Sequence, residues 1–152
     1  MNYQIQGLSI HAEEHGTGEP ALVFLHYWGG TSRTWRQVTA ELEGQFKTVA
    51  YDARGWGKSD KTLAGYKLAD LAVEALSLVN TLGIKQYVLV GHSMGGKVAQ
   101  LIASRRPEGL VGLILAAPAQ PRLGIILTRC VNSSSMLTTI VRTFLRPLAV
   151  VA

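Results

Sequence analysis

Strand-like apolar runs alternate with segments of helical periodicity along most of this chain, and that alternation limits its possible folds more than any other feature. Residues 21–25, 87–90 and 110–116 are continuous apolar runs, which are typical of strands covered on both faces. Residues 34–42 and 67–82 instead place apolar side chains three and four positions apart. Repeated strand and helix units predict the α/β class, with a mostly parallel, doubly wound sheet between two helical layers.

Turn residues indicate where several of the other elements begin and end. Residues 3–6 and 8–15 predict two short strands joined near Gly7 as a hairpin. Gly83 is placed to end the helix over 67–82. The remaining expected elements are a strand over 46–51 and a helix over 94–106.

The composition is that of a globular chain with a single core. Of the 152 residues, 47% are hydrophobic and 16% are charged, a balance that favours a packed domain over disorder. We expect residues 1–118 to form an incomplete core, because the recognisable pattern ends there. Residues 119–152 are then a tail, either the start of a lid or non-native sequence. Cys130 is the single cysteine, so neither an intrachain disulfide nor a thiolate metal cluster is expected.

The positive charge lies mostly in the tail. Eleven basic and ten acidic residues precede Ala119, whereas four arginines and no acidic residue follow Pro118, which together give the net charge of +5. Scattered arginines without clustered aromatic residues do not predict nucleic-acid binding. We recognise no membrane-spanning run and no secretion signal, so the expected location is the cytoplasm.

The segment Gly91-His92-Ser93-Met94-Gly95-Gly96 joins a predicted strand to a predicted helix. A serine at the tip of such a sharp turn requires strained backbone, and Gly91 and Gly95 allow neighbouring backbone to pass closely. The first amides of the following helix would face the serine hydroxyl, where a negative oxygen could form. The pattern predicts Ser93 as a nucleophile and the amide of Met94 as one donor of an oxyanion hole.

A second loop, His26-Tyr27-Trp28-Gly29-Gly30, follows the predicted strand over 21–25. With the segment Asp52–Ser59, these motifs give residues 10–118 a resemblance to the α/β-hydrolase superfamily, particularly its serine esterases and cofactor-free haloperoxidase relatives. The resemblance implies Ser93 as nucleophile, the amides of Trp28 and Met94 as the oxyanion hole, and no cofactor. Tyr27 stands where relatives commonly have glycine.

The other polar residues near these motifs are expected to support the site. His26 should brace its loop, His92 should orient or pack against the elbow, and Asp52 should shape the loop after the fourth strand. Gly29 belongs to the oxyanion loop. The remaining histidines, His11 and His15, are expected at the surface.

The catalytic triad is incomplete within these 152 residues. The superfamily places its acid and then its histidine after the nucleophile, but no histidine and only one acidic residue, Glu108, follow Ser93. Relatives are usually longer, with a lid after the sixth strand and further strands that carry both residues. The chain is therefore expected to be a fragment or prematurely ended product of a longer hydrolase, or a short protein that has lost the chemistry.

Two functions remain open at this point. The first is a serine hydrolase that cleaves small carboxylic esters through a Ser93 acyl-enzyme, impaired here by the missing triad partners. The second is a catalytically inactive binding or interaction module on the same scaffold. Relatives with an aspartate nucleophile, such as epoxide hydrolases, are disfavoured because a serine cannot form their alkyl-carboxylate ester. The strand over 110–116 would be a flat apolar edge, which predicts self-association unless the tail covers it.

Overall fold

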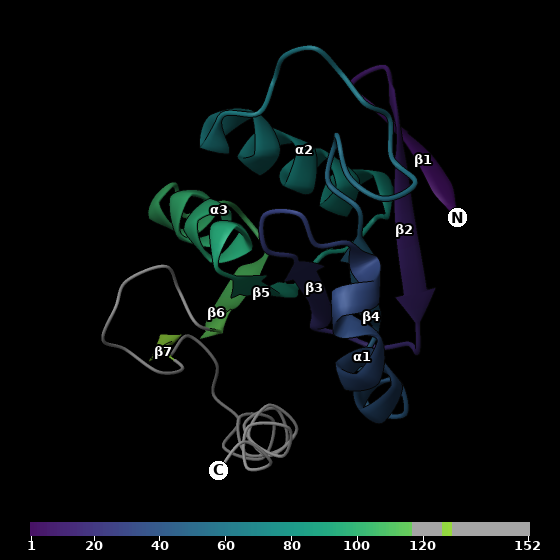
Figure 1. The fold of residues 1–152 in the computed structure, drawn as a ribbon. Helices are drawn as coiled ribbons and strands as arrows, with labels where there is room; N and C mark the ends of the chain where they lie inside the picture. The colour runs from purple at the N-terminus through teal and green to yellow at the C-terminus, as the bar shows by residue number, and fades with distance from the viewer. Residues whose placement is uncertain (117–125, 129–152) are drawn as a thin grey trace, which may run out of the picture.

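Seven strands form one sheet in the order β1-β2-β4-β3-β5-β6-β7, with helices on both faces (Figure 1). The computed structural model describes residues 1–116 and 126–128. The strands are β1 (Asn2–Ile5), β2 (Leu8–His15), β3 (Ala21–Leu25), β4 (Thr48–Tyr51), β5 (Tyr87–His92), β6 (Leu110–Ala116) and β7 (Ile126–Thr128). The helices are the 3₁₀ turn η1 (Ser32–Trp35), α1 (Arg36–Leu42), α2 (Leu68–Thr81) and α3 (Met94–Ser104). The predicted α/β class with a mostly parallel sheet is confirmed.

The chain enters the sheet through a hairpin. Strands β1 and β2 pair antiparallel, with Ile5 opposite Leu8. The two turn residues, Gln6 and Gly7, both have positive φ, of 53° and 79°. Positive φ at both central positions matches the right-handed twist of the strands, which is why such turns are favoured in short hairpins.

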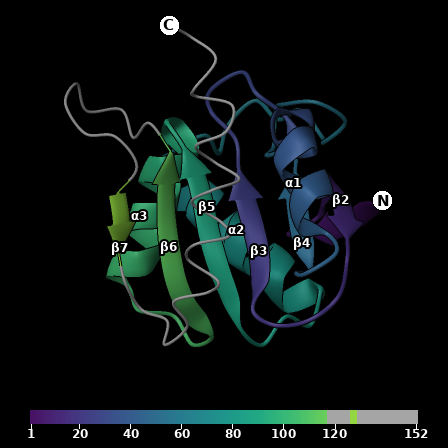
Figure 2. The ribbon, with the colours of Figure 1, turned by 90° about the horizontal axis from the view of Figure 1, so that it is seen from below.

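Strands β4, β3, β5 and β6 run parallel, so their carboxyl ends meet at one edge of the sheet (Figure 2). The register places Leu25, the last residue of β3, opposite Gly91 near the end of β5. The loop after β3 and the turn after β5 therefore leave the sheet side by side. In an open parallel sheet this edge is where ligands usually bind.

Two apolar clusters lie on opposite faces of the sheet. Val23 and Leu25 of β3 join the cluster under α2 and α3, whereas Leu22 and Phe24 join the cluster on the α1 side with Trp35. Successive strand residues point to opposite faces, so a strand buried on both sides must be apolar throughout. This explains why residues 21–25 show no alternation.

Several observed element boundaries differ from the predicted ones by one to a few residues, because of tertiary packing. The helix predicted over 34–42 begins earlier, as η1, and becomes α-helical only at Arg36. Helix α2 ends at Thr81, and beyond it the Gly83 N–H donates to the Asn80 carbonyl and the Ile84 N–H donates to the Val79 carbonyl. These two bonds form a Schellman motif, which requires the positive φ of 65° at Gly83.

The sequence did not predict β7, which pairs antiparallel with Leu113–Leu115 of β6. In the part of the chain described here, β6 is thus not the last strand of the sheet, and the tail covers part of the edge expected to be open. The rest of the predicted tail lies outside the described residues. No helix among residues 1–116 is long and apolar enough to cross a membrane.

Candidate active site

Ser93 occupies the sharp turn between β5 and α3, in a conformation that L-residues rarely adopt. Its φ is 51° and its ψ is −111°, while its neighbours belong to a regular strand and helix. Its N–H donates to the Ala116 carbonyl at 3.3 Å, and its hydroxyl makes no capping bond to α3. A strained, half-buried serine whose hydroxyl does not cap its own helix is the arrangement that a nucleophile elbow requires.

Two glycines make this turn possible. A Cβ on Gly91 would lie 2.5 Å from the Gly95 carbonyl oxygen and 2.6 Å from Cα of Gly96. A Cβ on Gly95 would lie 2.2 Å from the Leu25 carbonyl oxygen and 2.7 Å from that of His26. Gly91 therefore lets the elbow close on itself, and Gly95 lets α3 touch the start of the loop after β3.

The loop after β3 leaves backbone donors free beside the elbow. Gly29 has a φ of 82°, and the Gly30 N–H donates to the Tyr27 carbonyl at 2.9 Å. Within residues 1–116, the N–H groups of Trp28 and Met94 donate no hydrogen bond to the protein. Unpaired amides at the carboxyl edge of a sheet are suitable donors for a developing oxyanion.

His26 links this loop to the loop after β4. Its Nδ1 donates to the Tyr27 carbonyl at 2.7 Å, and its Nε2 accepts the Ala53 N–H at 3.0 Å. Burial lowers the pKa of His26, although the Tyr27 carbonyl and the charge of Asp52 oppose that shift. Both ring nitrogens are occupied in the neutral form, so this imidazole braces two loops and has no nitrogen left to act as a base.

The Asp52 carboxylate also connects the loop after β3 to the loop after β4. Its Oδ1 accepts the Ser32 N–H at 2.6 Å, and its Oδ2 accepts the Lys58 N–H at 2.8 Å. The carboxylate is buried, and a Cβ at Gly57 would lie 2.0 Å from Oδ2. A buried carboxylate needs such donors, so the loops on either side of it are fixed relative to each other.

His92 is the last residue of β5, and its ring packs against two aromatic side chains. Its ring lies edge-to-face against Tyr27, with 5.2 Å between centroids, and against Trp35, at 6.3 Å. Burial lowers its pKa, which favours the neutral form. These contacts place the imidazole against the loop after β3 and the end of η1.

The prediction that His11 lies at the surface is wrong. It is 8% exposed, because β1 covers it and its N–H donates to Ser59 Oγ at 2.8 Å. The same prediction is confirmed for His15, which is exposed and lies 3.6 Å from Glu43. All four histidines lie within residues 1–116, and in that part of the chain none of them hydrogen-bonds to Ser93.

Similarity to known proteins decides the family. Residues 20–144 match the model of the alpha/beta hydrolase fold. This chain belongs to the α/β-hydrolase family. It is 37% identical, over 71% of its length, to a 2-hydroxy-6-oxononadienedioate/2-hydroxy-6-oxononatrienedioate hydrolase of Burkholderia vietnamiensis and covers 39% of that protein.

Solved hydrolase-fold structures give the same result. The epoxide hydrolase CorEH superposes with a TM-score of 0.73 at 32% identity, over 76% of this chain and 41% of its own. An esterase from Exiguobacterium antarcticum superposes with the same TM-score at 28% identity, over 79% and 46% of the two chains. The chain thus spans less than half the length of these hydrolases and corresponds to their N-terminal part.

An aromatic cluster beside the elbow of this hydrolase-fold chain was not predicted. Trp28 packs edge-to-face on Trp56, with centroids 5.0 Å apart, and Trp56 packs in the same way on Tyr66, at 5.8 Å. We call Trp28, Trp56 and Tyr66 the aromatic shelf. Its residues come from two loops that are distant in sequence, and the only local signal was a tryptophan between two glycines, Gly55 and Gly57.

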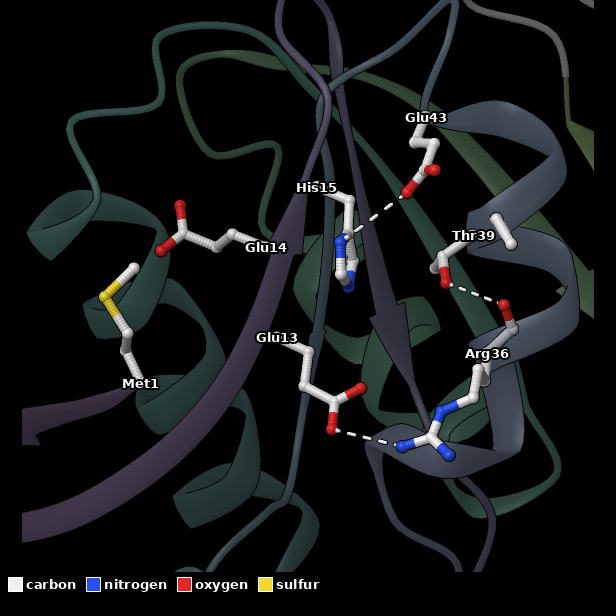
Figure 3. A pocket seen from close by; sticks show the side chains of 8 residues that line it. Met1, Glu13, Glu14, His15, Arg36, Thr39 and Glu43 are labelled. Carbon is white, nitrogen blue, oxygen red and sulfur yellow. Dashed lines mark hydrogen bonds and ion pairs between the residues drawn. The ribbon is translucent and has the colours of Figure 1, made fainter.

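A groove in the described part of the chain lies away from Ser93. It has a volume of about 510 Å³ and lies between β2 and α1 (Figure 3). Its charges are largely paired, since Arg36 lies 3.8 Å from Glu13 and His15 lies near Glu43. Because His15 pairs with Thr48, the first residue of β4, the groove lies toward the opposite end of the parallel strands from Ser93. Residues 1–116 hold no group of three side chains suited to a metal ion.

Proposed function

We propose that this chain carries the nucleophile and the oxyanion hole of a serine hydrolase that acts on small carboxylic esters. The strained backbone of Ser93 beside two unpaired amides is the observation that supports the proposal. Ser93 Oγ attacks the ester carbonyl carbon, and the amides of Trp28 and Met94 receive the negative oxygen of the tetrahedral intermediate. Collapse of the intermediate expels the alcohol, which takes up the proton that Ser93 lost, and leaves an acyl-serine that water then hydrolyses to the acid and free Ser93.

Ester chemistry fits this nucleophile better than epoxide opening does, although an epoxide hydrolase is among the similar structures. A carboxylate that opens an epoxide forms an ester, whose carbonyl allows water to release the product. A serine oxygen that opened an epoxide would form an ether, which has no carbonyl for water to attack. Ser93 would then be consumed after one turnover.

Among the described residues, no histidine is placed to accept the proton of Ser93. His26 has both nitrogens engaged, His92 packs on Tyr27 and Trp35, and the other two histidines lie in β2. A base and its orienting acid would have to come from outside the described residues. The proposed activity of the isolated chain is therefore slow acylation with little turnover, since oxyanion binding survives the loss of triad partners.

A fluorophosphonate probe tests this proposal, because it reacts only with an activated serine. We expect weak labelling that disappears in Ser93→Ala and persists in Ser104→Ala, which removes an exposed serine from the end of α3. Hydrolysis of p-nitrophenyl esters should be very slow. Equal labelling of the Ser93→Ala protein would refute the assignment of the nucleophile.

The alternative is an inactive binding module with the same scaffold. It is favoured by the position of the four histidines, none of which is bonded to Ser93 in the described residues. The two proposals differ in one outcome: the module predicts no labelling that depends on Ser93, at any probe concentration, in a protein that unfolds cooperatively.

A further inference from the structure

We propose that the aromatic shelf selects substrates whose ester group carries an aromatic ring, which stacks on the exposed indole of Trp28. This inference rests on the proposed ester chemistry at Ser93. It extends that chemistry from a class of reaction to a class of substrate, and its evidence comes from the side chains of two loops.

Trp28 exposes its indole to an unusual degree. The residue is 66% exposed, whereas Trp35, on the adjoining turn, is 3% exposed. A large apolar ring held in water next to a catalytic serine is a recognised mark of a binding surface. Its own backbone amide is the proposed oxyanion donor, so the indole belongs to the same residue that would contact the reacting carbonyl oxygen.

The ring is held in place by its neighbours. The Trp56 ring meets the Trp28 indole edge-to-face, with 77° between the ring planes. The His26 ring, whose nitrogens are both hydrogen-bonded, in turn contacts Trp56, with 5.7 Å between centroids. Tyr66 is the last ring of the row and lies at 89° to the plane of Trp56. Its hydroxyl donates to the Thr62 carbonyl at 2.8 Å. The aromatic shelf is therefore organised before any ligand arrives, which reduces the entropy lost on binding.

This arrangement requires a glycine at position 55. A Cβ on Gly55 would lie 2.5 Å from a ring carbon of Tyr66, and the φ of 88° at Gly55 also disfavours a side chain. The absence of a side chain at Gly55 therefore leaves room for the Tyr66 ring, which packs against Trp56. The row of edge-to-face rings ends at Trp28.

An aromatic group continues this row better than an aliphatic one. Edge-to-face and offset contacts between rings add to the free energy of burial because the edge of one ring is positive and the face of the other is negative. A saturated ring of similar size gains the burial without this electrostatic contribution. We therefore expect phenyl acetate to bind about three- to tenfold more tightly than cyclohexyl acetate.

Binding is measured on the Ser93→Ala protein, so that the result does not depend on catalysis. The chain has three tryptophans, whose indole N–H signals can be followed separately by NMR. Phenyl acetate should shift the signals of Trp28 and Trp56 and leave that of the buried Trp35 unchanged. Trp28→Leu should remove the preference for phenyl over cyclohexyl acetate, Trp28→Phe should restore much of it, and Val73→Ala, which trims an exposed side chain of α2, should retain it.

Other outcomes overturn the inference. Equal affinity for phenyl and cyclohexyl acetate would indicate a merely apolar surface, and tighter binding of tetramethylammonium would indicate a cation site on the indole face. Shifts confined to Trp35 would place the ligand elsewhere. The proposed function fails independently, through loss of Ser93-dependent labelling in the unaltered protein, so the two failures are distinguishable.

Discussion

At Gly95 the start of α3 approaches the backbone at the end of β3 so closely that a side chain does not fit. The Gly95→Ala variant should lose about 3 kcal/mol of unfolding free energy, because its Cβ would have to displace the Leu25 carbonyl from 2.2 Å. Urea unfolding measures the loss. Gly44→Ala is the matched control, since a Cβ there meets no atom within 4 Å, and it should stay within about 0.5 kcal/mol of the parent. Equal stability of the two variants would contradict the observed contact.

His26 should make the stability of the chain depend on pH. Burial holds its folded-state pKa below the ordinary value of 6.5, so the unfolded chain takes up a proton first as the pH falls. The free energy of unfolding should therefore be constant above pH 6.5 with respect to this group, and should fall as the pH drops from 6.5 through the folded-state pKa. Denaturant titrations across this range provide the measurement.

The matched variant for this pH effect is His26→Gln, whose amide can donate to Tyr27 and accept from Ala53 without titrating. It should flatten part of the slope below pH 6.5. The slope that remains belongs in part to His92, whose pKa burial also lowers. Identical slopes for the parent and His26→Gln would show that His26 does not titrate differently on folding.

At the residue scale, sequence patterns indicated which residue types the site needs but not which partners they would have. The pairing of Gly91 with Ser93 follows from the local geometry of the turn, so it could be predicted, whereas the contact that requires Gly95 is with Leu25 of a different strand. The bonds of Asp52 to Ser32 and Lys58 could not, because they join loops that only the paired strands bring together.

At the scale of elements, α2 is fastened to the loop after β4 by a buried ion pair. Arg54 Nε donates to Glu74 Oε2 at 2.7 Å, the Arg54 N–H donates to Oε1 at 3.1 Å, and the guanidinium also reaches Gln6. Burial raises the pKa of Glu74, while the hydrogen bonds and charge of Arg54 oppose that rise. The pair fixes the base of the loop that carries Trp56.

Glu74→Gln should destabilise the chain by about 3 kcal/mol, because the guanidinium of Arg54 stays buried without a full counter-charge. The exposed Glu41→Gln on α1 is the control and should change stability by less than about 0.5 kcal/mol. The double variant Arg54→Met/Glu74→Leu should lose less unfolding free energy than Arg54→Met and Glu74→Leu lose in sum. Thermal or urea unfolding of the set gives the coupling, and strict additivity would argue against the pair.

The elements themselves were largely predictable. The strands β2, β3 and β6 have the predicted bounds, because apolar runs between turn residues leave few alternatives. Helix α2 has its predicted bounds to within one residue at each end, since Gly83 supplies the positive φ that stops it. The start of α1 was missed because η1 depends on a distant side chain, Asp52, which accepts the Ser32 N–H.

For the molecule as a whole, we predict that self-association depends on how well the edge of β6 is covered. Among the described residues, β7 pairs with three residues of β6, with Leu127 opposite Ile114. The Leu127→Pro variant disrupts regular strand geometry in the middle of β7 and should increase self-association, because an uncovered apolar edge pairs with other chains. Sedimentation over a range of concentrations measures it. Leu127→Ala, which keeps the N–H, should behave like the parent, and unchanged sedimentation of both variants would show that β7 does not protect the edge.

The sequence by itself determined the α/β class, the order of most elements and the position of the serine turn. These depend on periodicity, on turn glycines and on the burial of apolar side chains, all of which are local. Only the tertiary structure decided that His11 is buried, that His26 and Asp52 connect two loops, that three aromatic rings from two loops pack in a row, and that β7 pairs with β6. Each of these requires segments far apart in sequence to meet, and which segments meet depends on how the strands pair, a choice that no local pattern contains.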